Sequence, residues 1–148
     1  MKIKTIRIMA VAAIVIIFIT SAITMAFSPK KNLKPSEYNL GTTYEMASVS
    51  KKPSIAIFYS DMCGYCIQSM PKYQALADIY KNKYNIVMIN AEDANNIHIL
   101  RDYAISSLPT LYIMDPSIDN RVYIPSFNNL ERLRVEFDRY LRIRAMIK

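Results

Sequence analysis

The chain has 148 residues, 52% of them hydrophobic, which provides one domain with a core and room for an appendage. Its net charge of +7 is uneven: residues 1–52 hold eight basic and two acidic side chains, residues 53–138 hold seven and ten, and residues 139–148 hold four basic ones. The central part is therefore mildly acidic, which argues against nucleic acid as a partner.

The N-terminus has the pattern of a targeting or anchoring segment. Lys2, Lys4 and Arg7 precede Ile8 to Phe27, a run of 20 residues without charge. Such a run predicts either a secretory signal or a helix that spans a membrane. Because a signal core is usually about 7–15 residues long, we expect a retained single span in contact with the lipid bilayer. The alternative is cleavage near Thr24-Met25-Ala26.

The export pattern places the N-terminus inside the cell and the rest of the chain outside the cytoplasm. In a Gram-negative cell, this is an inner-membrane protein whose domain faces the periplasm, where disulfides persist. If the signal is cleaved, the same domain is soluble in the periplasm or secreted. We divide the chain into a signal or anchor at residues 1–27, a basic linker at residues 28–42 and a folded domain at residues 43–148.

Hydrophobic patterns predict the secondary structure of the domain in chain order. Helices are expected at 43–50, 63–81, 94–103 and 129 to about 145, and strands at 54–59, 85–90, 110–114 and 121–125. A turn at 115–120 should join the last two strands. Asn128 or Asn129 should cap the last helix, whose inner face would be Leu130, Leu133, Phe137 and Leu141.

Cys63-Gly64-Tyr65-Cys66 contains the only two cysteines of the chain. Two thiols at this spacing can carry two electrons as a dithiol or a disulfide. The strand before the motif and the helix after it put Cys63 at a helix N-terminus, where unpaired N–H groups and the helix dipole favour a thiolate. We therefore predict Cys63 as the nucleophile and Cys66, one turn into the helix, as the resolving thiol. Asp61 would oppose this effect if it lies close.

The two cysteines could serve other chemistry. A structural zinc site needs four ligands, and the chain offers only Cys63, Cys66 and His98. A purely structural disulfide across so short a loop gains little stability. Met62 and Met70 would complete a set of soft ligands for Cu(I), so a copper-binding or copper-delivery module stays open as an alternative of another class. A scaffold with an idle motif is a third possibility. We expect no cofactor and no bound metal.

The block from Ile55 to Met114 resembles the thioredoxin family. Pro71 falls five residues after the second cysteine, where thioredoxins have a kink proline that interrupts the helix, and Pro109-Thr110 resembles the family's cis-proline loop. The resemblance implies a thioredoxin-like α/β fold, with a central mixed four-stranded sheet flanked by helices. It also implies that Gly64, Tyr65, Leu108 and the cis-proline Pro109 bind the substrate.

The resemblance has informative departures. Gly64-Tyr65 is similar to the dipeptide of some periplasmic disulfide isomerases. The family's buried acid aligns with Ile57, and its lysine partner falls near Met88, so both groups are absent. Leu108 replaces the more usual β-branched residue before the cis-proline, so the choice of substrate does not carry over.

The predicted activity is thiol–disulfide exchange on protein disulfides or dithiols. The tether favours a membrane-bound reductase supplied by a membrane electron donor, similar to tethered thioredoxins. A disulfide oxidase or isomerase is the alternative. Isomerases of this kind usually carry a dimerisation domain, for which the chain has no room, and we expect a monomer.

Overall fold

The computed structural model describes residues 33–125 and 129–147. Leu33–Lys148 is one compact unit of the chain. The predicted anchor at Ile8 to Phe27, residues 28–32 of the predicted linker, and Asn128 lie outside the described residues. Among the helices of residues 33–125 and 129–147, none combines the length and apolarity needed to span a bilayer.

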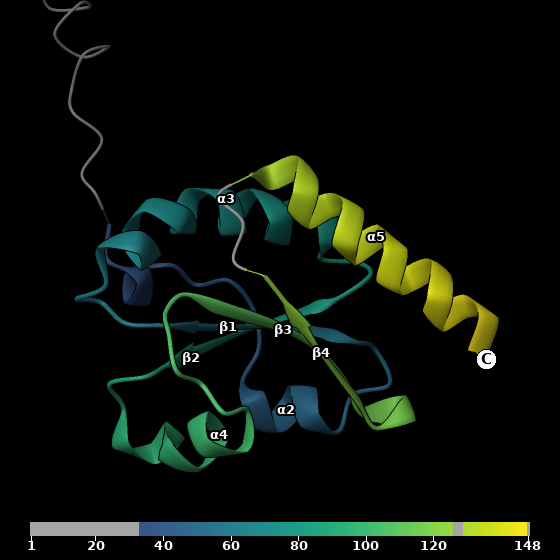
Figure 1. Cartoon of the computed structure of the whole chain (residues 1–148), viewed down its shortest axis with the longest axis horizontal. Coiled ribbons are helices and arrows are strands. Elements are labelled where there is room, and N and C mark those ends of the chain that lie inside the picture. Colours follow the sequence, from purple (N-terminus) through teal and green to yellow (C-terminus); the bar gives the residue numbers. More distant parts are fainter. Residues whose placement is uncertain (1–32, 126–128, 148) are drawn as a thin grey trace, which may run out of the picture. The chain divides into compact units, whose positions relative to one another are not determined.

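A mixed four-stranded sheet forms the centre of the domain (Figure 1). Its strands are β1 (Ser54–Tyr59), β2 (Asn85–Asn90), β3 (Thr110–Asp115) and β4 (Asn120–Ile124), in the order β2-β1-β3-β4. β2 is parallel to β1, β3 is antiparallel to β1, and β4 is antiparallel to β3. All six residues of β1 are buried, which explains why this central strand is an unbroken apolar run in the sequence.

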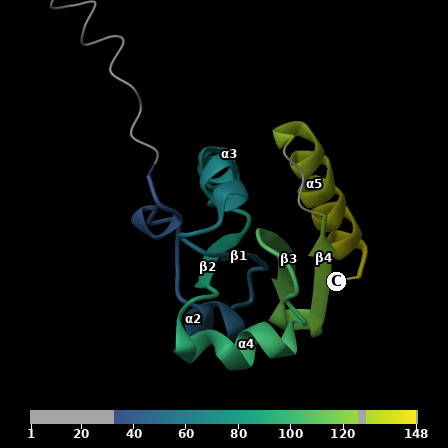
Figure 2. The ribbon, with the colours of Figure 1, turned by 60° about the vertical axis from the view of Figure 1, so that its left-hand side comes forward.

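Helices cover both faces of the sheet, as the sequence predicted. α3 (Gly64–Tyr80) and α5 (Leu130–Ile147) lie on one face, and α2 (Tyr44–Ser48) and α4 (Ile97–Asp102) lie on the other (Figures 1 and 2). Successive residues of a strand point to opposite faces. Ile55 and Ile57 accordingly join the core cluster that includes residues of α3 and α5, while Ala56 and Phe58 join the cluster with residues of α2 and α4.

The predicted bounds of β1 and β2 are confirmed, and the helix predicted at 94–103 differs in the structure. Residues 94–102 form a 3-10 turn, η2 (Ala94–Asn96), followed by α4. Pro71 lies inside α3, which continues from Gly64 through the proline to Tyr80. Its neighbours Met70 and Tyr73 are wholly buried, and this packing keeps the helix together around the proline.

The C-terminal part of the fold follows the expected caps and turns. Residues 116–118 form the 3-10 turn η3 (Pro116–Ile118), and Asp119 then takes a left-handed conformation before β4. Asn129 caps α5 as predicted, since its Oδ1 accepts from the N–H of Glu131 at 2.9 Å. Of the predicted inner face, Leu133 and Phe137 are wholly buried, and Leu130 and Leu141 pack against the core at its margin.

The predicted linker is partly a structured edge of the domain. η1 (Pro35–Glu37) and the residues after it pack on the fold, with Pro35 and Leu40 buried, and the N–H of Thr42 donates to the carbonyl of Ile86 at 2.9 Å. A Cβ at Gly41 would lie 2.2 Å from the Ile86 carbonyl oxygen, so only glycine allows this approach. The residues from Leu33 to Thr42 therefore belong to the compact unit.

A buried charge cluster lies where β3 ends. Asp115 is 0% exposed and binds the guanidinium of Arg144, the hydroxyl of Tyr140 at 3.2 Å and the hydroxyl of Ser117 at 2.6 Å. Arg144 also donates to the carbonyl of Lys51 at 2.7 Å. Burial alone would raise the pKa of Asp115, but these hydrogen bonds and the charge of Arg144 lower it overall. We call these four side chains the Asp115 cluster.

Candidate functional site

The two cysteines lie at the N-terminus of α3 and differ in exposure. Cys63 is the N-cap residue of the helix and is half-buried, and its Sγ accepts from the N–H of Cys66 at 3.2 Å. Cys66 is 0% exposed. Burial, followed by its hydrogen bond with Cys63, raises the pKa of the Cys66 thiol to about 12. Cys66 therefore stays protonated at neutral pH, and Cys63 is the sulfur that a substrate can reach.

The loop before β3 completes the site from a distant part of the sequence. The Leu108–Pro109 peptide bond is cis. The Cys63 thiol lies 3.6 Å from the carbonyl oxygen of Leu108 and can donate to it. Thr110 closes the loop, because its hydroxyl donates to the carbonyl of Ser107 at 2.6 Å. The fold thus brings together four of the predicted site residues, Cys63, Cys66, Leu108 and Pro109.

The other two predicted site residues begin α3 and face open surface. No atom lies within 4 Å of the place where a Cβ on Gly64 would be. Tyr65 is 69% exposed, and Met62, on the other side of the nucleophile, is 89% exposed. Large apolar side chains next to a reactive sulfur provide contact area for a polypeptide.

The contacts that hold the loop between β1 and Cys63 could not be read from the local sequence pattern. The Ser60 hydroxyl donates to Glu92 Oε1 at 2.8 Å, and the N–H of Asp61 donates to Glu92 Oε2 at 3.2 Å. The Asp61 carboxylate accepts from the N–H of Ser36 at 2.8 Å and from its hydroxyl at 2.5 Å. One signal could have revealed the first contact: β1 and β2 are parallel, so the residues that follow them meet at the same edge of the sheet.

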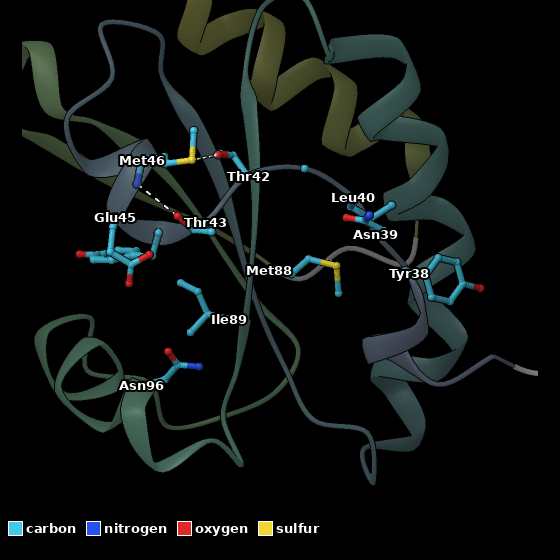
Figure 3. Close-up of a pocket in the computed structure, with 12 residues that line it drawn as sticks. Tyr38, Asn39, Leu40, Thr42, Thr43, Glu45, Met46, Met88, Ile89 and Asn96 are labelled. Carbon is cyan, nitrogen blue, oxygen red and sulfur yellow. Dashed lines mark hydrogen bonds between the residues drawn. The ribbon is translucent and has the colours of Figure 1, made fainter.

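A cleft of about 580 Å³ lies elsewhere on the domain. Figure 3 shows it between the segment from Tyr38 to Met46, the side chains of Met88 and Ile89, and Asn96. Neither cysteine lines this cleft, nor does Pro109. The thiol chemistry consequently belongs to the open surface around Cys63, which suits a protein substrate better than a small molecule.

The two methionines that would help to bind Cu(I) differ in exposure. Met62 is exposed, whereas Met70 is wholly buried in the core cluster on the α3 side of the sheet. Within residues 33–125 and 129–147, no group of three or more His, Cys, Asp and Glu side chains could hold a metal ion. His98 lies on the surface of α4.

Comparison with protein families identifies the domain. The model of the thioredoxin family matches residues 36–134, which include the two cysteines, the cis-proline and all four strands. The chain belongs to the thioredoxin family. Cys63 and Cys66 form the CXXC pair of this thioredoxin-family domain.

Several curated proteins are similar to this thioredoxin-family chain. Protein disulfide-isomerase of Drosophila melanogaster is 32% identical over 108 residues, 72% of this chain and 21% of that protein. Human protein disulfide-isomerase A4 is 31% identical over 94 residues, 63% of this chain and 14% of the relative. The chloroplastic thioredoxin-like protein HCF164 of Arabidopsis thaliana is 29% identical over 72 residues, 49% of this chain and 28% of the relative. The chain spans less than a third of the length of each of these relatives.

A solved structure supports the same fold. The J-Trx1 fragment of ERdj5 superposes with a TM-score of 0.59 at 22% identity, and the match covers 67% of this chain and 48% of that one.

Ile57 and Met88, which align with the family's buried acid and its lysine, are cross-strand partners in the sheet. Two apolar side chains thus face each other across β1 and β2 at the positions where many thioredoxins have an ion pair.

Proposed function

We propose that the protein is a membrane-tethered reductase of protein disulfides that acts outside the cytoplasm. The observation that carries the chemical part is the contrast between the two thiols: Cys63 is accessible at the helix N-terminus, while Cys66 is buried with its pKa raised to about 12. The anchoring part rests on the uncharged run from Ile8 to Phe27, which is long enough to span the hydrocarbon core of a bilayer.

The proposed reaction transfers two electrons and two protons to the substrate. The Cys63 thiolate attacks a substrate disulfide, and one substrate sulfur leaves and takes up a proton. The Cys66 thiol then loses its proton and attacks the Cys63 sulfur, which breaks the mixed disulfide and releases the second substrate thiol. The protein is left with a Cys63–Cys66 disulfide, and a dithiol donor in the membrane returns it to the reduced form.

The surroundings of the cysteines assign the roles of the other site residues. In the reduced form of the protein, the Leu108 carbonyl accepts a hydrogen bond from the Cys63 thiol. Pro109 has no N–H, so its backbone cannot bond to the sulfurs. Met62, Gly64 and Tyr65 form the open surface beside Cys63 that receives the substrate chain.

A disulfide oxidase or isomerase is the second candidate. It is favoured by the two relatives named as disulfide isomerases, at 31% and 32% identity. The same residues would run the exchange in the opposite direction, so the reduction potential distinguishes the two candidates.

The experiment uses the full chain purified in detergent and equilibrated with mixtures of reduced and oxidised thiol buffer. Free thiols are then alkylated and the protein is weighed by mass spectrometry. A potential near that of thioredoxin, about −270 mV, supports the reductase, while one near −120 mV makes the protein an oxidant of folding chains. The lack of any reversible two-electron couple contradicts both candidates.

The location needs a separate measurement. Cells that express the full chain are treated with a maleimide that does not cross membranes, and then fractionated. We expect Cys63 to be labelled in intact cells and the labelled chain to sediment with the membranes, with the Cys63→Ser variant as the unlabelled control. A shorter labelled chain in the soluble fraction would indicate cleavage, and labelling only after lysis would contradict the proposed orientation.

A further inference from the structure

Ser60 contacts both cysteines through its backbone. Its carbonyl accepts from the N–H of Cys63 at 3.3 Å, and a hydrogen bond with its backbone partly offsets the rise in the pKa of the Cys66 thiol. Its hydroxyl accepts from the N–H of Met62 at 3.1 Å, so the residue also shapes the turn before the nucleophile. Because Ser60 is buried, any shift of this residue changes the environment of the two sulfurs together.

Glu92, which lies in the turn after the neighbouring strand β2, holds the loop before Cys63. Its two carboxylate oxygens accept from consecutive residues, from the Ser60 hydroxyl at 2.8 Å and from the N–H of Asp61 at 3.2 Å. Glu92 is itself fixed, since its N–H donates to Asn90 Oδ1 at 2.9 Å and the preceding N–H of Ala91 donates to the carbonyl of Tyr59 at 2.8 Å. A carboxylate attached to the end of β2 thus supports the loop that presents Cys63.

We propose that Glu92 is a positioning residue for the redox couple: acting through Ser60, it fixes the loop before Cys63, and its charge favours the disulfide over the dithiol. The inference rests on the thiol–disulfide exchange of Cys63 and Cys66 and adds the group that sets its direction. It makes the reduced protein a stronger reductant than the same site would be with a neutral residue at position 92.

The sign follows from the charges of the two redox states. The reduced pair can carry a thiolate, whereas the disulfide is neutral, so a nearby carboxylate destabilises only the reduced form. The field of this acidic group reaches the end of β1: burial and then the charges of Asp61, Glu92 and Asp93 raise the pKa of Tyr59. The charge opposes the N-terminus of α3, which stabilises a thiolate. Since Glu92 is exposed, solvent screens the effect and keeps it modest.

The test measures the equilibrium constant of the full chain with glutathione, written for formation of the protein disulfide. We expect Glu92→Gln to lower this constant by roughly three- to tenfold, which corresponds to about 15–30 mV toward a more oxidising couple. Glu92→Asp, which keeps the charge, should recover part of the change. Unchanged constants in Glu92→Gln would overturn the proposal.

The control is Asp93→Asn, which removes the same charge from the next residue. The Asp93 carboxylate accepts from the N–H of Asn95 at 2.9 Å, at the start of η2. We expect it to change the constant by less than about twofold, because its hydrogen bond does not involve the loop before Cys63. An effect as large as that of Glu92→Gln would reduce the role of Glu92 to general surface charge and contradict positioning.

A double-mutant cycle tests the route through Ser60. In a Ser60→Ala background, Glu92→Gln should lower the constant by less than it does in the wild-type chain, because the shared hydrogen bond is already absent. Fully additive effects would contradict the route. If Ser60→Ala does not fold, the equilibrium constants of Glu92→Gln and Glu92→Asp are compared instead to decide whether the carboxylate of Glu92 has this role. If the wild-type chain shows no reversible couple, the proposed function itself is refuted. If the couple is reversible but its equilibrium constant does not change in Glu92→Gln, only the role of Glu92 is refuted.

Discussion

The two ends of the sheet both contain carboxylates, and they use them differently. At one end, Glu92 and Asp61 lie near the surface and hold the loop before Cys63. At the other end, Asp115 is wholly buried and is bound by Arg144, Tyr140 and Ser117. The register places these ends apart, because Phe58 pairs with Thr110 near the cysteines while Ser54 pairs with Met114 beside Asp115.

This difference indicates a division of work within one small domain. A buried charge destabilises the fold strongly when its partner is removed, so we expect substitutions in the Asp115 cluster to act on stability. An exposed carboxylate is screened by water, so it can shift a redox equilibrium by a modest amount while the fold stays intact. Substitutions at the cysteine end should therefore change chemistry at nearly constant stability, and substitutions at the Asp115 end should do the reverse.

The largest effect is expected at the cysteine end. Cys63→Ser should reduce disulfide exchange with a protein substrate below detection, because the remaining thiol is buried and protonated. Serine is a good N-cap, so the free energy of unfolding should change by no more than ~0.5 kcal/mol in a urea titration. Cys66→Ser is the matched control and should accumulate mixed disulfides through Cys63. Retained turnover in Cys63→Ser would contradict its role as the nucleophile.

At the other end, Arg144→Ala should destabilise the fold by ~3–5 kcal/mol, since it leaves the Asp115 carboxylate buried without its ion-pair partner. Urea unfolding of the full chain measures the change, and Arg142→Ala, an exposed residue of α5, is the control with an expected change within ~0.5 kcal/mol. The reduction potential of the folded variant should equal that of the wild type. A shifted potential would show that the two ends are coupled.

The pH dependence of stability should separate the same two regions. The pKa of Asp115 is lowered in the folded state, so its contribution is fully present above the unfolded pKa of about 3.9 and is lost as the pH falls through the folded value. The difference in unfolding free energy between the wild type and Arg144→Ala should thus be constant from pH 7 to about pH 5 and shrink at lower pH. A difference that does not depend on pH would mean that Arg144 acts through packing alone.

The segment from Ser36 to Gly41 contacts both ends of the sheet. Ser36 binds Asp61 near the cysteines, and Gly41 lies against Ile86, which pairs with Ile55 toward the Asp115 end. Gly41→Ala should destabilise the fold by ~1–3 kcal/mol, because the added Cβ would lie 2.2 Å from a backbone oxygen and the segment must move away. Urea titration measures the cost. A neutral effect would show that the segment is not held at this point.

The sequence predicted the parts of the site that depend on local pattern. Short apolar runs rich in β-branched and aromatic residues located the strands, and the CxxC spacing at a strand–helix junction located the two thiols and their order of burial. It did not predict the role of Arg144, because the basic turns after Arg139 resemble an ordinary solvated helix end. Nor did it predict the contact between Ser60 and Glu92, which are 32 residues apart and meet only through the parallel pairing of β1 and β2.

The smallest effect is expected at Gly64, whose open surroundings contrast with the close contact at Gly41. Gly64 is the first residue of α3, and no atom lies within 4 Å of its would-be Cβ. Gly64→Ala should therefore stabilise the fold by no more than ~0.5–1 kcal/mol through helix propensity. Its reduction potential should stay within about 10 mV of the wild type, less than half of the shift that a tenfold change in equilibrium constant produces. A larger redox effect from one exposed methyl group would mean that the backbone at position 64, and not the carboxylate of Glu92, is the more sensitive control of the cysteine pair.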